Sequence, residues 1–286
     1  MVEAPPVEEL SDPRAQRLAD LAKPGRANAK AVLIEDPETL LQCLRSGVDF
    51  LEVYHQADRP PQPELAELCA ARRVPLAPVA PAVVNRVFKA DRKPHVFGAA
   101  LVPRPATLGR LLEAPGDIVV LDGVRITGNI GAIVRSATAL GAAGVVLLDS
   151  GIASVADRRL LRASRGHVFS IPVVLAEAPQ LLAFLETNRI PALVFGASAE
   201  MGLADAVRDP GRHALVFGSE RQGPSALLRG ARATPVSVPM TRGVESLNVS
   251  VCVGVALHER LRERRGITAS AAGSRRDGWQ GAGPPS

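Results

Sequence analysis

Cysteine is scarce in this sequence, and its scarcity argues against several kinds of site. The 286 residues include three cysteines, Cys43, Cys69 and Cys252, which lie far apart and form no CxxC pair. A disulfide framework or a zinc site requires paired or clustered ligands. The five histidines are also scattered, and none lies at ligand spacing from a cysteine or a pair of acids. We therefore expect reduced core thiols and no metal.

Long hydrophobic runs are also lacking. No apolar stretch approaches the ~18 residues that a membrane span requires, and the first residues, MVEAPPVEEL, are acidic and contain proline, unlike a secretory signal. The 47% hydrophobic content is nevertheless ample for a packed core. We expect a globular cytoplasmic protein that does not associate with membranes.

Lysine is rare, with four residues against 30 arginines, and the formal net charge is +5. A basic chain suits an anionic partner. However, arginine together with abundant alanine, proline and glycine is also typical of a GC-rich genome. Overall charge is therefore weak evidence for nucleic-acid binding.

The pattern of helices and strands predicts an α/β fold in two domains. We expect an N-terminal α/β domain over 11–104, with Ser11 capping its first helix, a linker over 105–116 and a second domain over 117–266. In the second domain nearly every strand is continuously apolar, as in a parallel sheet covered on both faces. There we predict a strand within 168–174, a short helix over 224–230 and a last helix from 246 to about 265. Residues 267–286 lack periodicity and should be disordered.

Three loops after predicted strands are the places to look for a site, because open parallel sheets bind ligands beyond the carboxyl ends of their strands. They are DGVRITGNIGAIVR (122–135), FGSERQGPS (217–225) and PMTRGVESLNVSVCVG (239–254). Arg135 lies among the apolar positions of a predicted helix, so it must reach solvent or a partner. Asn129 can cap that helix.

Structural explanations exist for each of these residues taken singly. Asn129 and Ser246 are common helix caps, and Glu220 suits a first helical turn. A dinucleotide site is also conceivable, because two glycines follow a strand and Asp149 ends the next one. The spacing is GNIG rather than GxGxxG, however, which argues against that site.

Taken together, the loops resemble a known family. NIGAIVR (129–135), LVFGSERQGPS (215–225) and SLNVSVCVGVALHE (246–259) are similar to the three ordered motifs of the SpoU family of RNA ribose 2′-O-methyltransferases. Residues 26–55, 84–98 and 156–174 further resemble its thiostrepton and nosiheptide resistance 23S rRNA (adenosine-2′-O)-methyltransferases. The resemblance implies S-adenosylmethionine as cofactor, a SPOUT trefoil-knot catalytic domain, a homodimer with its site near the interface, and a ribosomal-protein-like RNA-binding N-terminal domain. Topology rules alone would not predict a knot.

The resemblance also implies roles for individual residues. The implied catalytic residues are Arg135, Asn129, Glu220, Ser246 and Asn248. The implied cofactor contacts are Phe195, Gly196, Gly218, Ser219, Glu220, Val238, Met240 and Leu247. In the family mechanism the arginine is often the base, yet a guanidinium is effectively always protonated. We therefore expect Arg135 to stabilise the developing alkoxide and position a phosphate, with the proton leaving to the nucleotide's phosphate or to water.

Two basic clusters are candidates for the RNA surface. The first surrounds an aromatic that could stack on an unpaired base, although Phe88 could equally pack in the core beside Val84 and Val87. The second lies on a helix, where spacing by three puts Arg159, Arg162 and Arg165 on one face. The predicted RNA-binding residues are Arg26, Arg86, Phe88, Lys89, Arg92, Lys93, Arg162 and Arg165.

We accordingly expect an enzyme that methylates an adenosine 2′-hydroxyl in the thiopeptide-binding region of large-subunit ribosomal RNA and so confers antibiotic resistance. One alternative is the same chemistry on another ribosomal or transfer RNA nucleotide. Another is a non-catalytic protein that protects ribosomal RNA by occupying it.

Overall fold

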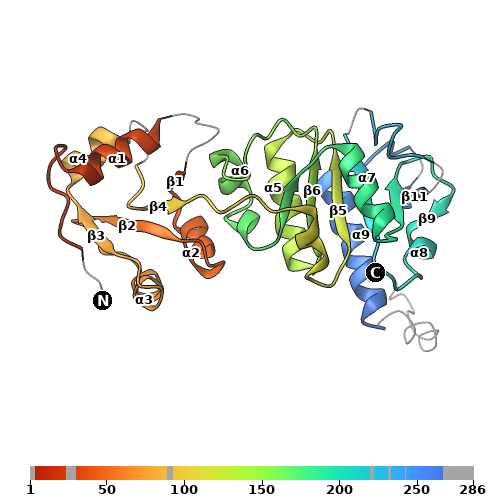
Figure 1. Cartoon of the computed structure of the whole chain (residues 1–286), viewed down its shortest axis with the longest axis horizontal. Coiled ribbons are helices and arrows are strands. Elements are labelled where there is room, and N and C mark those ends of the chain that lie inside the picture. Colours follow the sequence, from red (N-terminus) through yellow and green to blue (C-terminus); the bar gives the residue numbers. More distant parts are fainter. Residues whose placement is uncertain are drawn as a thin grey trace, which may run out of the picture.

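The structure, a computed structural model, describes residues 4–23, 30–88, 93–219, 222–230, 233–241 and 243–266. Their strands form two sheets that lie at opposite ends of an elongated molecule (Figure 1). The first sheet has the order β1-β4-β2-β3, in which β4 runs antiparallel to both neighbours and β2 pairs parallel with β3. Its elements are α1 (Pro13–Ala22), β1 (Ala31–Ile34), α2 (Pro37–Arg45), β2 (Phe50–Gln56), α3 (Pro63–Ala71), β3 (Leu76–Val79), α4 (Pro81–Val87) and β4 (Val96–Leu101).

Proline and aspartate set the starts of these helices. All four begin at a proline, whose fixed φ and missing N–H suit the first helical position. Asp36 caps α2 by accepting from the Thr39 backbone N–H at 2.8 Å. The predicted Ser11 cap of α1 is wrong, because Asp12 performs that role and accepts from the Arg14 backbone N–H.

The second sheet has seven strands in the order β7-β6-β5-β10-β8-β11-β9, and every pairing is parallel. The predicted parallel sheet is therefore confirmed. Its elements are η1 (Leu108–Leu112), β5 (Ile118–Asp122), α5 (Thr127–Ala139), β6 (Gly144–Leu148), α6 (Arg158–Ala163), η2 (His167–Phe169), β7 (Val173–Leu175), α7 (Ala178–Thr187), β8 (Ala192–Phe195), β9 (Met201–Gly202), α8 (Leu203–Ala206), β10 (Ala214–Gly218), β11 (Ala233–Ser237) and α9 (Val249–Arg264).

Three predicted elements differ from the structure. The strand predicted within 168–174 is instead the 3-10 turn η2 followed by β7, since Pro172 has no N–H for a ladder and pairing begins at Val173. Within 224–230 the structure has a turn over 226–229 in place of the predicted helix. The last helix begins at Val249, three residues later than predicted.

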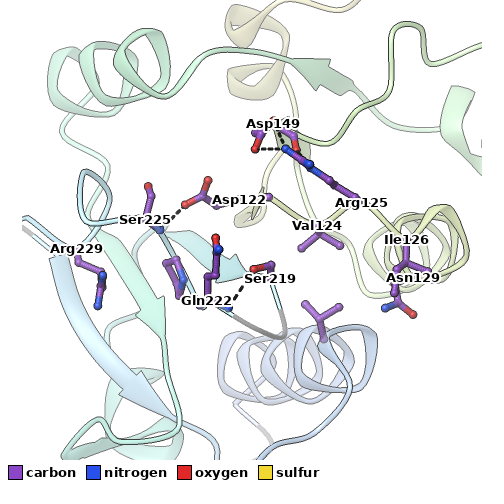
Figure 2. Close-up of a pocket in the computed structure, with 14 residues that line it drawn as sticks. Asp122, Val124, Arg125, Ile126, Asn129, Asp149, Ser219, Gln222, Ser225 and Arg229 are labelled. Carbon is purple, nitrogen blue, oxygen red and sulfur yellow. Dashed lines mark hydrogen bonds and ion pairs between the residues drawn. The ribbon is translucent and has the colours of Figure 1, made fainter.

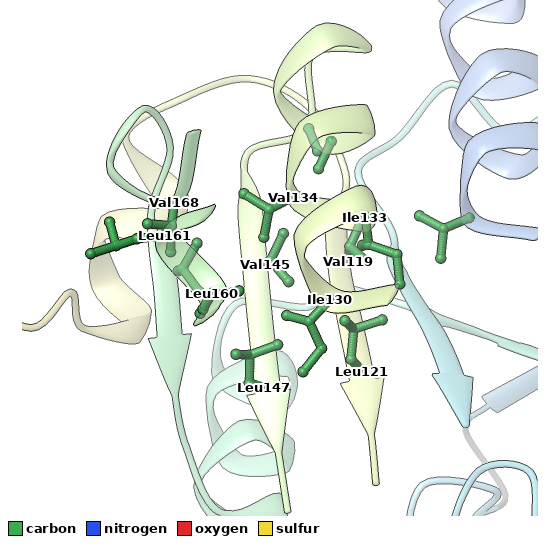
Figure 3. Close-up of a cluster of buried hydrophobic side chains, with 14 of the residues drawn as sticks. Val119, Leu121, Ile130, Ile133, Val134, Val145, Leu147, Leu160, Leu161 and Val168 are labelled. Atoms are coloured by element: carbon green, nitrogen blue, oxygen red, sulfur yellow. The ribbon is translucent and has the colours of Figure 1, made fainter. Parts of the chain in front are cut away.

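The seven-stranded sheet is buried on both faces. Val119 and Leu121 of β5 pack with α5 and α9 in one apolar cluster, as Figure 3 shows for the α5 side. Ile118 and Val120, pointing the other way, pack in a second cluster with α7. Alternate residues of one strand thus serve two cores, which explains the unbroken apolar runs of the sequence.

Glycine allows α5 to approach α6 closely. A Cβ added at Gly131 would lie 2.4 Å from the Cβ of Ala163, which is closer than two non-bonded carbon atoms can approach. The structure thus gives this motif glycine a packing role between two helices.

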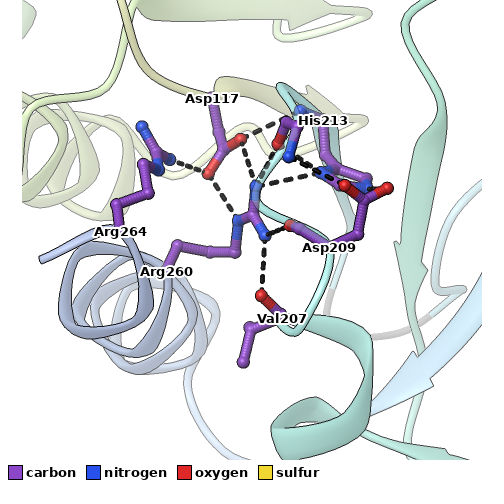
Figure 4. A network of polar contacts seen from close by, with 7 residues as sticks. Asp117, Val207, Asp209, His213, Arg260 and Arg264 are labelled. Atoms are coloured by element: carbon purple, nitrogen blue, oxygen red, sulfur yellow. Dashed lines mark hydrogen bonds and ion pairs between the residues drawn. The ribbon is translucent and has the colours of Figure 1, made fainter. Parts of the chain in front are cut away.

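A buried arginine anchors the far end of α9 (Figure 4). Arg260 is fully buried and donates to both carboxylate oxygens of Asp117, at 2.8 and 3.1 Å. It also donates to the backbone carbonyl of Val207 at 3.0 Å, and Arg264 forms a further ion pair with Asp117. The charge is therefore compensated within the core, as buried charges must be.

Ion pairs join the N-terminal elements to the second part of the chain where α6 faces β1 and α2 (Figure 1). Arg158 and Arg162 both pair with Glu35 just after β1, and Arg165 pairs with Glu38 at 2.8 Å. We call these five residues the α6 clasp. Its ion pairs fix the N-terminal elements against the end of the seven-stranded sheet.

Candidate active site

A cavity of about 840 Å³ opens at the carboxyl edge of β5, β6 and β10 (Figure 2). Parallel strands place their ligand sites at this edge. The cavity is lined by Asp122, Gly123, Val124, Arg125, Ile126, Asn129, Asp149, Ser219, Gln222, Gly223, Pro224, Ser225, Arg229 and Val249. Two sequence-predicted site residues, Asn129 and Ser219, are therefore on its wall.

The first turns of α5 and α9 bring two predicted catalytic residues together. The Asn248 Nδ2 donates to Asn129 Oδ1 at 3.3 Å. Asn248 is also the N-cap of α9, since its Oδ1 accepts from the Ser250 backbone N–H at 2.9 Å. The predicted capping role of Asn129 is wrong, because α5 begins at Thr127 and Asn129 lies inside its first turn. Ser246 is exposed and precedes α9 by three residues.

Arg135 lies outside the cavity. It is exposed on α5, on the helix face opposite the buried Ile133 and Ala137. Six residues of helix separate it from Asn129, a rise of about 9 Å. Among the described residues no ion pair engages its guanidinium. Burial and the nearby Arg135 charge lower the pKa of His167, which favours a neutral imidazole beside it.

The loop after β10 doubles back very tightly. The Gly223 backbone N–H donates to the Ser219 carbonyl at 2.8 Å, and Gly223 has a φ of +64°. A Cβ added at Gly218 would lie 1.9 Å from the Gly223 carbonyl carbon and 2.0 Å from the Pro224 nitrogen. Only glycine fits at position 218. The predicted Glu220 lies outside the described residues.

The remaining predicted cofactor residues follow the neighbouring strands β8 and β11. Phe195 is buried and stacks on Phe217, with ring centroids 4.3 Å apart. Gly196 is exposed, and a Cβ added there would meet no atom within 4 Å. Val238, Met240 and Leu247 are half-buried in the segment between β11 and α9. They do not line the cavity of Figure 2.

The predicted RNA surface differs in the structure from the expectation, chiefly at its aromatic residue. Phe88 is 5% exposed and packs edge-on against Phe97, so it is the core residue of the alternative interpretation rather than a stacking platform. Arg86 is exposed and Lys93 half-buried nearby. The predicted Arg26, Lys89 and Arg92 lie outside the described residues.

The second predicted RNA cluster is engaged within the chain. Arg162 and Arg165 belong to the α6 clasp, where acids of the N-terminal elements neutralise them. Their side chains are nevertheless 73% and 54% exposed. Sequence spacing located the basic face but not the acids, because Glu35 and Glu38 are more than 120 residues distant along the chain.

Sequence reasoning considered Asp149 only for a dinucleotide site and missed Asp122, Arg125, Ser225 and Arg229 of the polar cavity wall. Arg125 donates to Asp149 at 2.7 and 2.8 Å, and the Ser225 backbone N–H donates to the buried Asp122 at 2.6 Å. Arg229 completes this set. The signal available was position: Asp122 ends one buried strand and Asp149 directly follows the next, which is where ligand-facing residues gather.

The described residues contain neither a cluster of metal ligands nor a helix suited to a membrane. No group of three or more histidine, cysteine or acidic side chains there is placed to hold a metal ion. Likewise, none of the described helices has the length and apolar character needed to cross a bilayer.

The fold and the cavity define an open-sheet α/β protein with a cavity at the carboxyl strand edge, where proteins of this class bind their ligands. Comparison with known families makes this specific: residues 117–258 match the SpoU rRNA Methylase family, and residues 4–114 match the family described as the N terminus of the thiostrepton-resistance methylase. The chain belongs to the SpoU rRNA methylase family. The resemblance seen in the sequence motifs is confirmed.

Individual relatives span nearly the whole chain. A 23S rRNA (adenosine(1067)-2′-O)-methyltransferase of Streptomyces azureus is 47% identical over 261 residues, covering 91% of this chain and 97% of that protein. Its counterpart from Streptomyces laurentii is 47% identical over 254 residues, covering 89% and 94%. The solved SpoU methyltransferase AviRb from Streptomyces viridochromogenes, in complex with S-adenosylmethionine, is 25% identical with a TM-score of 0.72, covering 89% of this chain and 98% of that one.

Proposed function

We propose that this chain transfers a methyl group from S-adenosylmethionine to the 2′-hydroxyl of an adenosine in the thiopeptide-binding region of 23S ribosomal RNA. The observation that carries the proposal is 47% identity, over about nine-tenths of the chain, to two 23S rRNA (adenosine(1067)-2′-O)-methyltransferases. The modification would confer resistance to thiostrepton- or nosiheptide-like antibiotics. Because its substrate is ribosomal RNA, we expect the enzyme to act in the cytoplasm.

We assign the cofactor to the carboxyl ends of β8, β10 and β11. The open backbone at Gly196 and the tight loop at Gly218 fit a ligand held mainly by backbone groups. The S-adenosylmethionine bound by AviRb supports the identity of the cofactor. When bound, the cofactor supplies the methyl group on its sulfonium. The proposed contacts remain Phe195, Gly196, Gly218, Ser219, Glu220, Val238, Met240 and Leu247.

Arg135 is proposed to stabilise the negative charge that develops on the ribose oxygen. A 2′-hydroxyl is a poor nucleophile and must lose its proton during attack. A permanently charged guanidinium suits stabilisation of that oxygen and of a neighbouring phosphate, while the proton passes to the phosphate or to water. Asn129 and Asn248, joined at 3.3 Å, would orient the ribose, with Glu220 and Ser246 completing the polar wall.

The pH dependence of the rate tests this role for Arg135. We expect single-turnover methyl transfer by wild type to show no ionisation that disappears in Arg135→Lys. An ionisation lost specifically in that variant would identify the arginine as a base.

A homodimer is proposed because the cavity rim and α9 expose apolar side chains. Ile126 before α5 is 58% exposed, and Val251 and Val255, one turn apart on α9, are 49% and 36% exposed. A second copy of the chain would cover these surfaces. We also propose the trefoil knot that membership of the SpoU family implies.

The N-terminal domain, 11–104, is proposed to bind the RNA, joined through 105–116 to the catalytic domain, 117–266. The exposed Arg86 and the nearby Lys93 support a basic surface on α4 and before β4. Arg26, Lys89 and Arg92 would extend it. Arg92→Ala should weaken RNA binding and reduce its salt dependence while leaving cofactor binding intact.

The test of the proposed function uses tritiated S-adenosylmethionine and a hairpin from the thiopeptide-binding region. We expect methylation of the hairpin and none when the target adenosine is 2′-deoxy or already methylated. Methylation of a different ribosomal or transfer RNA instead would identify a sibling activity. Tight hairpin binding without cofactor binding would identify a non-catalytic protection protein.

A further inference from the structure

Arg125 and Asp149 form an oriented pair on the cavity wall (Figure 2). The Arg125 Nη2 donates to both Asp149 carboxylate oxygens, at 2.8 and 2.7 Å, and its Nε donates to the Asp149 carbonyl at 3.2 Å. Both side chains are about two-thirds exposed, at 66% and 70%. Such an exposed pair contributes little to stability, so the contacts serve to hold a donor and an acceptor side by side.

The backbone of Asp149 is also unusual. Its φ is +44°, a left-handed conformation that non-glycine residues seldom adopt. Asp149 directly follows β6 and contacts Arg125, which comes from the β5–α5 loop. The two groups therefore converge on the cavity from neighbouring strands.

We propose that the Arg125–Asp149 pair reads the base of the target adenosine; this rests on the proposed function and names the residues that choose its nucleotide. Adenine presents an N6 amino donor beside an N1 acceptor, which matches a carboxylate acceptor beside a guanidinium donor. Guanine and uracil present an acceptor beside a donor, so their carbonyl would face the carboxylate. Cytosine shares the order of adenine on a smaller ring.

The cavity supports this position for the base. A volume of about 840 Å³ lies within the range of ligand pockets and admits a nucleotide extruded from its stack. Asn129 and Ser219 line the same cavity, so a base held by Arg125 and Asp149 would lie beside the proposed ribose and cofactor contacts. Arg229 adds positive charge for the phosphates.

The experiment compares two hairpins that differ by one group. One carries adenosine at the target and the other carries purine riboside, which has hydrogen in place of the N6 amino group. For each, the dissociation constant and the single-turnover methylation rate are measured with wild type and with Asp149→Gly. Glycine adopts the φ of this position without strain, so the variant removes the carboxylate and keeps the turn.

For wild type we compare the ratio of the single-turnover rate to the dissociation constant between the two hairpins. We expect this ratio to be about 10- to 100-fold higher for adenosine than for purine riboside, which is the effect of one hydrogen bond to a charged acceptor. In Asp149→Gly the preference should fall to within about threefold, because the partner of N6 is gone. The control is Asp205→Ala, which breaks the similarly exposed pair between Asp205 of α8 and Arg208 just after that helix, neither of which lines the cavity. It should keep the wild-type preference.

The two proposals fail in different ways. Methylation of both hairpins at equal efficiency by wild type, or an unchanged preference in Asp149→Gly, would overturn the base-reading pair and leave the methyltransferase function standing. Absence of methylation with an N6-dependent affinity that Asp149→Gly abolishes would refute the function and support the pair. Equal affinity of wild type for both hairpins without methylation would overturn both.

Discussion

Replacing Arg260 with methionine should strongly destabilise the catalytic part of the chain. The side chain is fully buried, and methionine keeps most of its length without its charge. Asp117 would lose two hydrogen bonds, at 2.8 and 3.1 Å, and the Val207 carbonyl would lose its donor. Removing one partner of a buried ion pair costs about 3–5 kcal/mol because the other charge stays buried. Arg264 still pairs with Asp117, which favours the lower end of that range.

The assay is differential scanning calorimetry at fixed protein concentration. For a domain of 150–250 residues, each kcal/mol lowers the melting temperature by about 2–4 °C, so we expect Arg260→Met to lower it by roughly 6–20 °C. The control is Arg262→Met on the same helix, which breaks a partly exposed pair with Glu259 and should cost about 0.5 kcal/mol. Equal melting temperatures for the two variants would refute the anchoring role of Arg260.

Three further outcomes follow from the structure. Gly218→Ala should abolish S-adenosylmethionine binding in calorimetric titration, because its Cβ would overlap the returning loop; wild-type affinity would contradict that close approach. Arg158→Ala should loosen the α6 clasp at Glu35 and raise hydrogen exchange where α6 meets β1, and unchanged exchange would count against the clasp. Arg135→Ala should raise the pKa of His167 toward its ordinary value in an NMR titration, since a nearby positive charge is removed; an unmoved pKa would place Arg135 elsewhere.

The lowered pKa of His167 also predicts how the stability of the folded chain changes with pH. Burial and Arg135 lower its folded pKa below the unfolded value of about 6.5. The unfolded chain then binds a proton that the folded chain resists, so this residue should reduce stability as the pH falls through 6.5. Urea titrations of wild type and His167→Gln at pH 7.5 and pH 5.5 would measure it, and the variant should lose less stability on acidification.

Local sequence patterns predicted helices and strands correctly where a single physical cause determines the local structure. The apolar runs at 118–121 and 144–148 are strands of a parallel sheet because both faces are buried. Gly218, predicted as a cofactor contact, lies so close to Gly223 and Pro224 of its own loop that a side chain would not fit. Helix starts were less predictable, since several residues at 11–12 and at 246–248 are equally good caps and tertiary contacts choose among them.

Long-range pairs were beyond the reach of sequence patterns. The pairing of Glu35 with Arg158, of Asp117 with Arg260, and of Asn129 with Asn248 each spans more than 110 residues. For Phe88 the local pattern was misleading. Its basic neighbours along the chain suggested RNA binding, but its ring packs on Phe97 in the core. In each case the decisive partner comes from an element that the local pattern does not contain.

The central claim is tested most directly by methyl transfer to a single defined atom. The measurement is incorporation of tritiated methyl from S-adenosylmethionine into the thiopeptide-region hairpin by wild type and by Arg135→Ala. The account predicts one methyl group per hairpin, at the 2′-oxygen of one adenosine, and its loss with the 2′-deoxy target and with the variant. Methylation that persists on the 2′-deoxy target, or that lies on a base, would contradict it.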